Sequence, residues 1–246
     1  MPEQLSAIAL AVFAAALMGF AKTALPAAAI LSVALMAAAF DDNAQLSVGA
    51  MLPILLVGDV FAVAWFRRHA QWDRLWALAP FVAAGMIPAF FVLAWFPENK
   101  LRPVLGWLVL GLLLLELGRT LWHGKTAPHG WWFSAIVGSL AGFGTMVGNA
   151  GGPAMNVYLL SRGMLKEQFV GTCAWFFFLL NLSKVLPFWR QGMLPREALT
   201  FGAWMIPAVV AGGALGVWAL PRLPQRAFNA AAWLLAGAAA VWLIAW

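Results

Sequence analysis

Four side chains that can carry charge or orient a ligand stand inside stretches of this sequence that are otherwise apolar. Lys22 occurs in MGFAKTALP, Asp59 in LLVGDVFAVAW, and Asn181 and Lys184 in FFFLLNLSKVLPF. An ammonium group can hold an anion, an amide can orient it, and a buried carboxylate can carry a proton or pair with a lysine. An ionisable group inside a membrane span costs from about 2.5 kcal/mol upward, so these positions need an explanation.

Their spacing favours a shared anion site but leaves alternatives open. Asn181 and Lys184 are three residues apart and therefore share a helix face. Neither Lys22 nor Lys184 has an acidic neighbour in sequence, which favours two ammonium groups lining one anion site. Alternatively, each lysine pairs with a nearby carboxylate or carbonyl, or extends to the membrane surface. Asp59 is either a structural partner of one lysine or a carboxylate that couples transport to protons.

A second set of candidates lies at two breaks in the apolar pattern, GFAKTALP and GFGTMVGNAGGPAMN. A broken helix leaves unpaired N–H groups at the start of its second half, where the helix dipole favours an anion. Glycines let a ligand approach those N–H groups closely. The breaks add five candidate substrate-binding residues to Lys22, Asn181 and Lys184: Thr23, Asn149, Gly151, Gly152 and Asn156.

Composition requires a membrane to position these residues. The chain has 246 residues, of which 64% are hydrophobic and 10% are charged, whereas soluble domains have about 25% charged residues. The runs 75–97, 198–221 and 227–246 carry no charge over 23, 24 and 20 residues, and about 20 apolar residues cross a bilayer. The apolar N-terminus lacks a positive start, so we interpret it as the first helix and not as a signal peptide.

The expected fold is an all-α polytopic membrane protein. Helical segments are predicted at 5–20, 26–40, 44–66, 74–96, 101–122, 131–147, 153–162, 166–189, 197–220 and 225–245. The segments 26–40 and 153–162 are too short to cross comfortably, and each opens with a proline, Pro26 or Pro153. Residues 6–40 could form a re-entrant hairpin, two short crossing helices or one broken helix.

The order of segments indicates two repeats, each a broken-helix hairpin followed by three transmembrane helices. The repeats are expected at 1–123 and 131–246, joined by a loop at 124–130, in one integral membrane domain. Met86-Ile87-Pro88-Ala89 recurs as Met205-Ile206-Pro207-Ala208, which supports the repetition. If each broken pair goes in and comes back, the two repeats are inverted and the two breaks meet near the midplane.

Loop charge favours this inverted arrangement. It gathers nine lysines and arginines on one side and four on the other, whereas crossing helices would divide them seven to six. The positive-inside rule then places both termini on the non-cytoplasmic side of the inner (plasma) membrane.

Other classes of function lack support in the sequence. No G-x-x-x-x-G-K-[ST] motif occurs, so we expect neither ATP-driven transport nor a cofactor. The three histidines form no metal-ligand pattern, no catalytic triad occurs within the spans, and we expect no enzyme. The net charge of +6 comes from short loops, so the expected partners are lipid and a small anion, not nucleic acid. A homodimer is one assembly that the sequence leaves open.

The two glycine-containing breaks, the span with Asn181 and Lys184, and the later PAVVAGGALG resemble the sulfite exporter TauE/SafE family of membrane permeases. The resemblance covers nearly the whole chain, although Thr23-Ala24-Leu25 stands where more glycine is usual. It implies a secondary transporter, an exporter of sulfite or small organosulfonates, driven by an ion or proton gradient. The alternatives are an anion channel, a permease for small carboxylates, an intramembrane enzyme and a non-transporting assembly factor.

Overall fold

The computed structural model is helical wherever it describes regular structure. It describes residues 4–40, 44–95, 103, 106–107, 110–111, 113–114, 130–146, 149, 151–190 and 192–245. Within these ranges there are nine α-helices, three short 3-10 helices and no strand. The helices are α1 (Leu5–Thr23), α2 (Ala29–Ala39), α3 (Ala44–Phe66), α4 (Trp72–Trp95), α6 (Trp131–Met146), α7 (Gly152–Ser161), α8 (Lys166–Arg190), α9 (Arg196–Ala219) and α10 (Gln225–Ala245). The 3-10 helices are η1 (Pro26–Ala28), η2 (Arg67–His69) and η3 (Leu220–Arg222).

The predicted fold class is confirmed, and five of the described helices are long and apolar enough to cross a membrane. They comprise Leu5–Thr23, Gly49–His69, Trp72–Phe91, Lys166–Arg190 and Arg196–Arg222. The predicted segment 101–122 lies largely outside the described residues, and those described between 103 and 114 are helical. One predicted boundary was wrong: α1 continues to Thr23, so Lys22 lies in its last turn and not in a loop.

The chain divides into two compact units that each combine early and late segments. Unit 1 comprises Met1–Ala70 and Lys166–Gln225, and unit 2 comprises Gln71–Leu165 and Arg226–Trp246. The repeat boundaries at 123 and 131 are a different division and stay a prediction.

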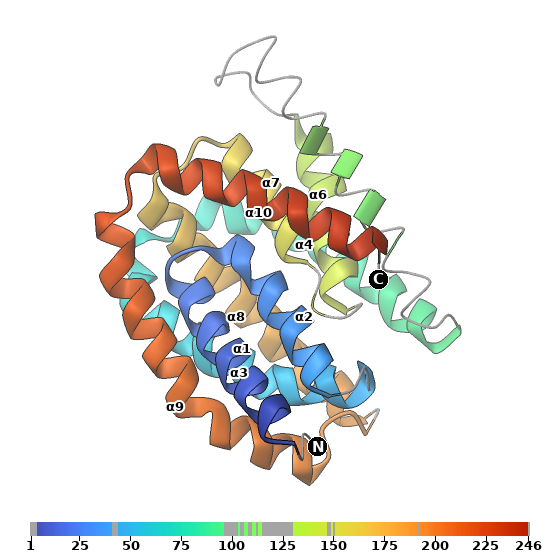
Figure 1. The fold of residues 1–246 in the computed structure, drawn as a ribbon. Coiled ribbons are helices and arrows are strands. Elements are labelled where there is room, and N and C mark those ends of the chain that lie inside the picture. Colours follow the sequence, from blue (N-terminus) through green and yellow to red (C-terminus); the bar gives the residue numbers. More distant parts are fainter. Residues whose placement is uncertain are drawn as a thin grey trace. The chain divides into compact units, whose positions relative to one another are not determined.

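In unit 1, α1 packs against α2, α3 and α9, and α3 packs against α8 and α9 (Figure 1). Small side chains let these helices approach closely. The core cluster that they share is Ala11, Ala14, Ala15, Met18, Val33, Met36, Ala39, Phe40, Ala50, Met51, Ile54, Leu55, Ala198, Met205 and Val209.

The first broken pair is a hairpin. The hydroxyl of Ser32 in α2 donates to the carbonyl oxygen of Ala14 in α1 at 2.6 Å, about equally far from the turn on either side. Pro26 opens the returning segment as the first residue of η1, where its missing N–H costs no helical hydrogen bond. At about 1.5 Å per residue, the 11 residues of α2 extend only about 16 Å. This fold-back excludes the single broken helix among the three arrangements considered for residues 6–40, and it fits both the re-entrant hairpin and the two short crossing helices.

The second broken pair, in unit 2, folds back in the same way. The rings of Phe133 in α6 and Tyr158 in α7 stack at 6.3 Å between centroids. Arg162, just after α7, donates from Nη2 to the hydroxyl of Ser134 at 3.3 Å. Both pairs join the start of α6 to the far end of the returning segment, so α7 returns alongside α6. Each half of the chain therefore contains a helical hairpin with a short second arm.

Each first arm also makes a glycine-mediated crossing with a longer helix. In unit 1, a Cβ atom at Gly19 of α1 would overlap the carbonyl oxygen of Val209 in α9. A Cβ atom at Gly212 of α9 would overlap the carbonyl oxygen of Ala16 in α1. The two backbones therefore touch at a reciprocal contact that only glycine allows.

The same contact recurs in unit 2 between α6 and α4. A Cβ atom at Gly142 would overlap the carbonyl oxygen of Val82, and one at Gly85 would overlap that of Ser139. In all four helices the glycine follows the carbonyl-bearing residue by three positions. This recurrence supports an internal repeat, while the inverted relation of the halves stays a prediction.

Candidate functional site

The tip of the first hairpin carries a buried ion pair. Nζ of Lys22, in the last turn of α1, lies 2.6 Å from Oδ1 of Asp59 in α3. Asp59 is 0% exposed and Lys22 is 5% exposed. The close approach of α1 and α3 depends on Gly58, because a Cβ there would lie 3.1 Å from Cγ of Lys22. Of the two interpretations of Asp59, the structure shows the structural partner of Lys22, and proton coupling remains untested.

Helix α8 adds an amide and a second ammonium group to this pair. Asn181 Nδ2 donates to Oδ2 of Asp59 at 2.6 Å, so each carboxylate oxygen has a partner. Lys184, three residues further along α8 and on the same helix face as Asn181, is fully buried. We call Lys22, Asp59, Asn181 and Lys184 the charged cluster. The structure thus brings together four predicted residues from three helices.

Aromatic rings surround the two ammonium groups. Nζ of Lys22 lies 4.7 Å from the ring centroid of Phe177, and Nζ of Lys184 lies 5.9 Å from that of Phe188. Phe177 precedes Asn181 by four residues and so occupies the same face of α8. Phe177 was not among the predicted site residues, although its four-residue spacing from Asn181 places both side chains on one face of the helix. The π face of an aromatic ring attracts an ammonium group, so each ring helps to hold its lysine in place.

The formal charge of the cluster is positive. The cluster contains two buried lysines and one carboxylate, of which Lys22 and Asp59 form an ion pair. Within the described helices, every other acidic residue lies in a first turn: Asp73, Glu167 and Glu197. Ammonium and amide N–H groups in an apolar interior are suited to holding an oxyanion.

Thr23 packs α1 against α9. Its hydroxyl is fully buried and lies 2.9 Å from the carbonyl oxygen of Gly213 and 3.1 Å from that of Gly19. A hydroxyl that bonds to neighbouring backbones holds two helices together. The predicted role of Thr23 in substrate binding stays a prediction.

The tip of the second hairpin is uncharged. Asn149 has a φ of 61°, a left-handed conformation that asparagine tolerates better than most residues. Gly151 packs against the carbonyl of Ala141, and α7 begins at Gly152 with Pro153 in its first turn. No described atom lies within 4 Å of a Cβ built at Gly152. Residues 147, 148 and 150 of the predicted break lie outside the described residues.

Asn156 combines full burial with an unmet hydrogen-bonding capacity. It follows Gly152 by four residues on the same face of α7, and it is 0% exposed. Neither its Oδ1 nor its Nδ2 has a hydrogen-bond partner among the described residues. A buried polar group without a partner costs about 1–3 kcal/mol, which makes Asn156 a candidate for contact with a ligand or an ordered water molecule.

The nine predicted site residues thus form two groups. Lys22, Thr23, Asp59, Asn181 and Lys184 lie in unit 1, and Asn149, Gly151, Gly152 and Asn156 lie in unit 2. Each group is described within its own unit, so the expectation that the two tips meet stays a prediction. Among the described residues, no group of three or more His, Cys, Asp or Glu side chains could hold a metal ion. Cys173 is buried with a free thiol.

Several apolar spans, two helical hairpins and a buried charged cluster define a polytopic membrane protein of the transporter class. The chain belongs to the sulfite exporter TauE/SafE family, whose sequence profile matches residues 10–243. This is a family of membrane transporters and not of enzymes, and the match confirms the resemblance seen in the sequence. No curated protein and no solved structure matches the chain with significant similarity.

Proposed function

We propose that this protein is a secondary transporter that exports small sulfur-containing oxyanions such as sulfite or organosulfonates. The observation that carries the proposal is the charged cluster itself, which gathers two buried lysines, one carboxylate and one amide among the apolar helices of unit 1. Ammonium and amide N–H groups are the donors that bind and orient an oxyanion. Family membership narrows the anion to the sulfur oxyanions.

The second hairpin supplies hydrogen bonds without charge in this proposal. The open space over Gly152, the first N–H groups of α7 and the Asn156 amide suit one end of a small oxyanion. The two tips would then face one site near the membrane midplane, as in transporters built from inverted repeats.

Asp59 is the proposed coupling group. Its carboxylate joins Lys22 and Asn181, so gain of a proton by Asp59 would release both partners toward the anion. Proton binding and anion binding would then favour each other, which couples anion movement to a proton gradient, and alternating access follows from the movement of one part of the molecule against another. The distribution of loop lysines and arginines supports an inner-membrane location with both termini outside the cytoplasm.

Flux through proteoliposomes tests the proposal. The purified protein is reconstituted and tested with sulfite, sulfate, taurine, sulfoacetate and acetate, with protein-free liposomes as the control. We expect saturable flux of sulfite or a sulfonate that rises with an imposed proton gradient. Non-saturable flux would favour a channel, saturable flux of acetate alone would favour a carboxylate permease, and no flux of any anion would refute the transporter.

A further inference from the structure

Arg162, the residue that follows α7 in unit 2, has a hydrogen-bonding capacity that its surroundings meet only in part. Its Nη2 donates to the hydroxyl of Ser134 in α6 at 3.3 Å. Its Nε is buried and has no hydrogen-bond partner among the described residues. The ion pairs found in the same part of the chain do not include Arg162. Because buried polar groups are normally bonded, Arg162 can still donate to a further acceptor.

The ring beside this guanidinium carries a second unmet group. Cζ of Arg162 lies 4.9 Å from the ring centroid of Tyr158, one turn earlier in the chain. Tyr158 is fully buried, and its hydroxyl has no hydrogen-bond partner in the described part of the chain. A buried tyrosine hydroxyl usually finds an acceptor. Two donors on adjacent groups therefore lack one, and Arg162 itself is only partly buried, so a ligand can approach it.

The end of α7 does not need the guanidinium as a cap. Backbone N–H groups that follow the helix already donate to the carbonyl oxygens of Leu159 and Leu160, at 3.2 and 3.0 Å. The hydroxyl of Ser161 donates to the carbonyl oxygen of Tyr158 at 2.6 Å. The last carbonyls of a helix are the groups that a capping side chain would serve. Capping therefore does not explain the position of Arg162.

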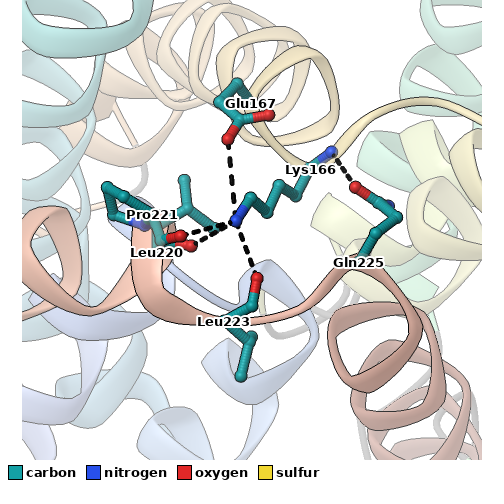
Figure 2. A network of polar contacts seen from close by, with 6 residues as sticks. All are labelled: Lys166, Glu167, Leu220, Pro221, Leu223 and Gln225. Carbon is teal, nitrogen blue, oxygen red and sulfur yellow. Dashed lines mark hydrogen bonds and ion pairs between the residues drawn. The ribbon is translucent and has the colours of Figure 1, made fainter.

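Lys166 in unit 1 shows how this chain satisfies a basic side chain that does cap a helical segment (Figure 2). Its Nζ donates to the carbonyl oxygens of Leu220, Pro221 and Leu223 at 2.9, 3.0 and 2.7 Å. An ammonium group has three N–H bonds, and each therefore has its own acceptor. Among the described residues, the guanidinium after α7 has no such set of acceptors, which favours a ligand.

The start of α6 has the residues of a membrane surface. Trp131 and Trp132 are 77% and 45% exposed, and tryptophan is enriched at both membrane–water interfaces. Ser134, which accepts the bond from Arg162, follows within one helical turn. The guanidinium is therefore expected near the depth of the lipid headgroups, where phosphate groups are abundant and basic pockets between helices bind them.

We propose that Arg162, Tyr158 and Ser134 form a site for a phosphate group, carried by an anionic phospholipid or free in solution. Nε of Arg162 and the hydroxyl of Tyr158 donate to the phosphate oxygens, while Ser134 holds the guanidinium in place. Bonds between a guanidinium and a phosphate are charge-assisted and strong. This site goes beyond the proposed function, because it does not depend on which anion the protein transports.

Thermal unfolding in detergent tests the site in two arms, with phosphatidylglycerol or with inorganic phosphate. The variants are Arg162→Met and Tyr158→Phe. The matched control is Arg74→Met, which removes an equal charge from an exposed position in the first turn of α4. We expect Arg162→Met to weaken binding about tenfold, Tyr158→Phe to weaken it about fivefold and the control to bind as the wild type does.

The two arms identify the source of the phosphate. Stabilisation of the wild type by phosphatidylglycerol alone assigns the phosphate to a lipid, and stabilisation by inorganic phosphate assigns it to a free anion. Stabilisation by neither, or equal affinity in Arg162→Met and the wild type, would overturn the site. If Arg162→Met does not fold, Tyr158→Phe decides, because it removes only a hydroxyl that has no partner among the described residues. Wild-type affinity in that variant would overturn the site as well.

A second readout reports on the site directly. Tyr158 is the only tyrosine of the chain, so protein labelled with 3-fluorotyrosine gives one fluorine NMR signal. We expect the stabilising ligand to shift this signal in the wild type and in Arg74→Met, and to leave it unmoved in Arg162→Met at the same concentration. An unmoved signal in the wild type would contradict the proposal. Absence of anion flux in proteoliposomes would refute the transporter and leave this result unaffected.

Discussion

The two helical hairpins share a scaffold and differ in chemistry. Both fold back on a short second arm, and both first arms cross a longer helix through reciprocal glycine–carbonyl contacts. At the first tip, Lys22 is paired with Asp59, and Asp59 accepts a hydrogen bond from Asn181. The second tip has no charged side chain and offers glycines and the amide of Asn156. Two hairpins of similar backbone structure therefore carry charged groups at one tip and uncharged hydrogen-bonding groups at the other.

The largest effect is expected from breaking the charged tip. Lys22→Met leaves Asp59 buried without its counter-ion and should lower the free energy of unfolding by about 3–5 kcal/mol. The double variant Lys22→Met/Asp59→Asn removes both charges and should recover most of that loss. Thermal unfolding in detergent measures both. Equal midpoints for Lys22→Met and the wild type would show that the ion pair does not hold the first tip.

Because both first arms make the same glycine-mediated crossing, we expect substitution of a crossing glycine to lower stability equally in the two halves. The loss should be smaller than that caused by Lys22→Met. Gly19→Ala and Gly142→Ala each force a methyl group onto a backbone carbonyl and should each cost about 1–3 kcal/mol. Gly237→Ala is the matched control, because no described atom lies within 4 Å of a Cβ at that helical position. Thermal unfolding compares the three. A loss in only one of the two glycine variants would mean that the crossings are not equivalent.

The two buried asparagines should respond differently to the same substitution. Asn181→Leu removes a hydrogen bond to the carboxylate of Asp59 and should cost about 2 kcal/mol. Asn156→Leu removes an amide that has no partner among the described residues, so we expect little change in stability. We expect it to weaken sulfite binding instead, measured as the thermal shift on adding sulfite. An equal loss of stability in both variants would remove the distinction between the tips.

The sequence predicted the helices and the chemically active side chains, because both depend on local patterns. Charge-free runs of about 20 residues located the spans, and proline and glycine located the breaks. The amide and ammonium of α8 followed from their three-residue spacing on an apolar helix. The predicted end of α1 was wrong, because Lys22 and Thr23 continue the helix into the expected turn.

The pairing of these residues could not be predicted, because it depends on packing between distant segments. Asp59 is 37 positions from Lys22 and 122 from Asn181, and only the crossing of α1, α3 and α8 brings them together. The Met-Ile-Pro-Ala echo repeats after 119 positions, whereas Gly85 and Gly212 make equivalent contacts 127 positions apart. The two offsets differ by about two helical turns. The repeated Met-Ile-Pro-Ala sequence therefore does not mark structurally equivalent positions.

The central claim is that the lysines of the charged cluster bind an anion. Its most direct test is the affinity for sulfite of the wild type, Lys184→Met and Arg190→Met, measured from the thermal shift over a sulfite titration. Arg190 is exposed at the end of the same helix, so the control removes an equal charge from α8. We predict that Lys184→Met weakens binding by more than about tenfold and that Arg190→Met binds as the wild type does. Wild-type affinity in Lys184→Met would contradict the account.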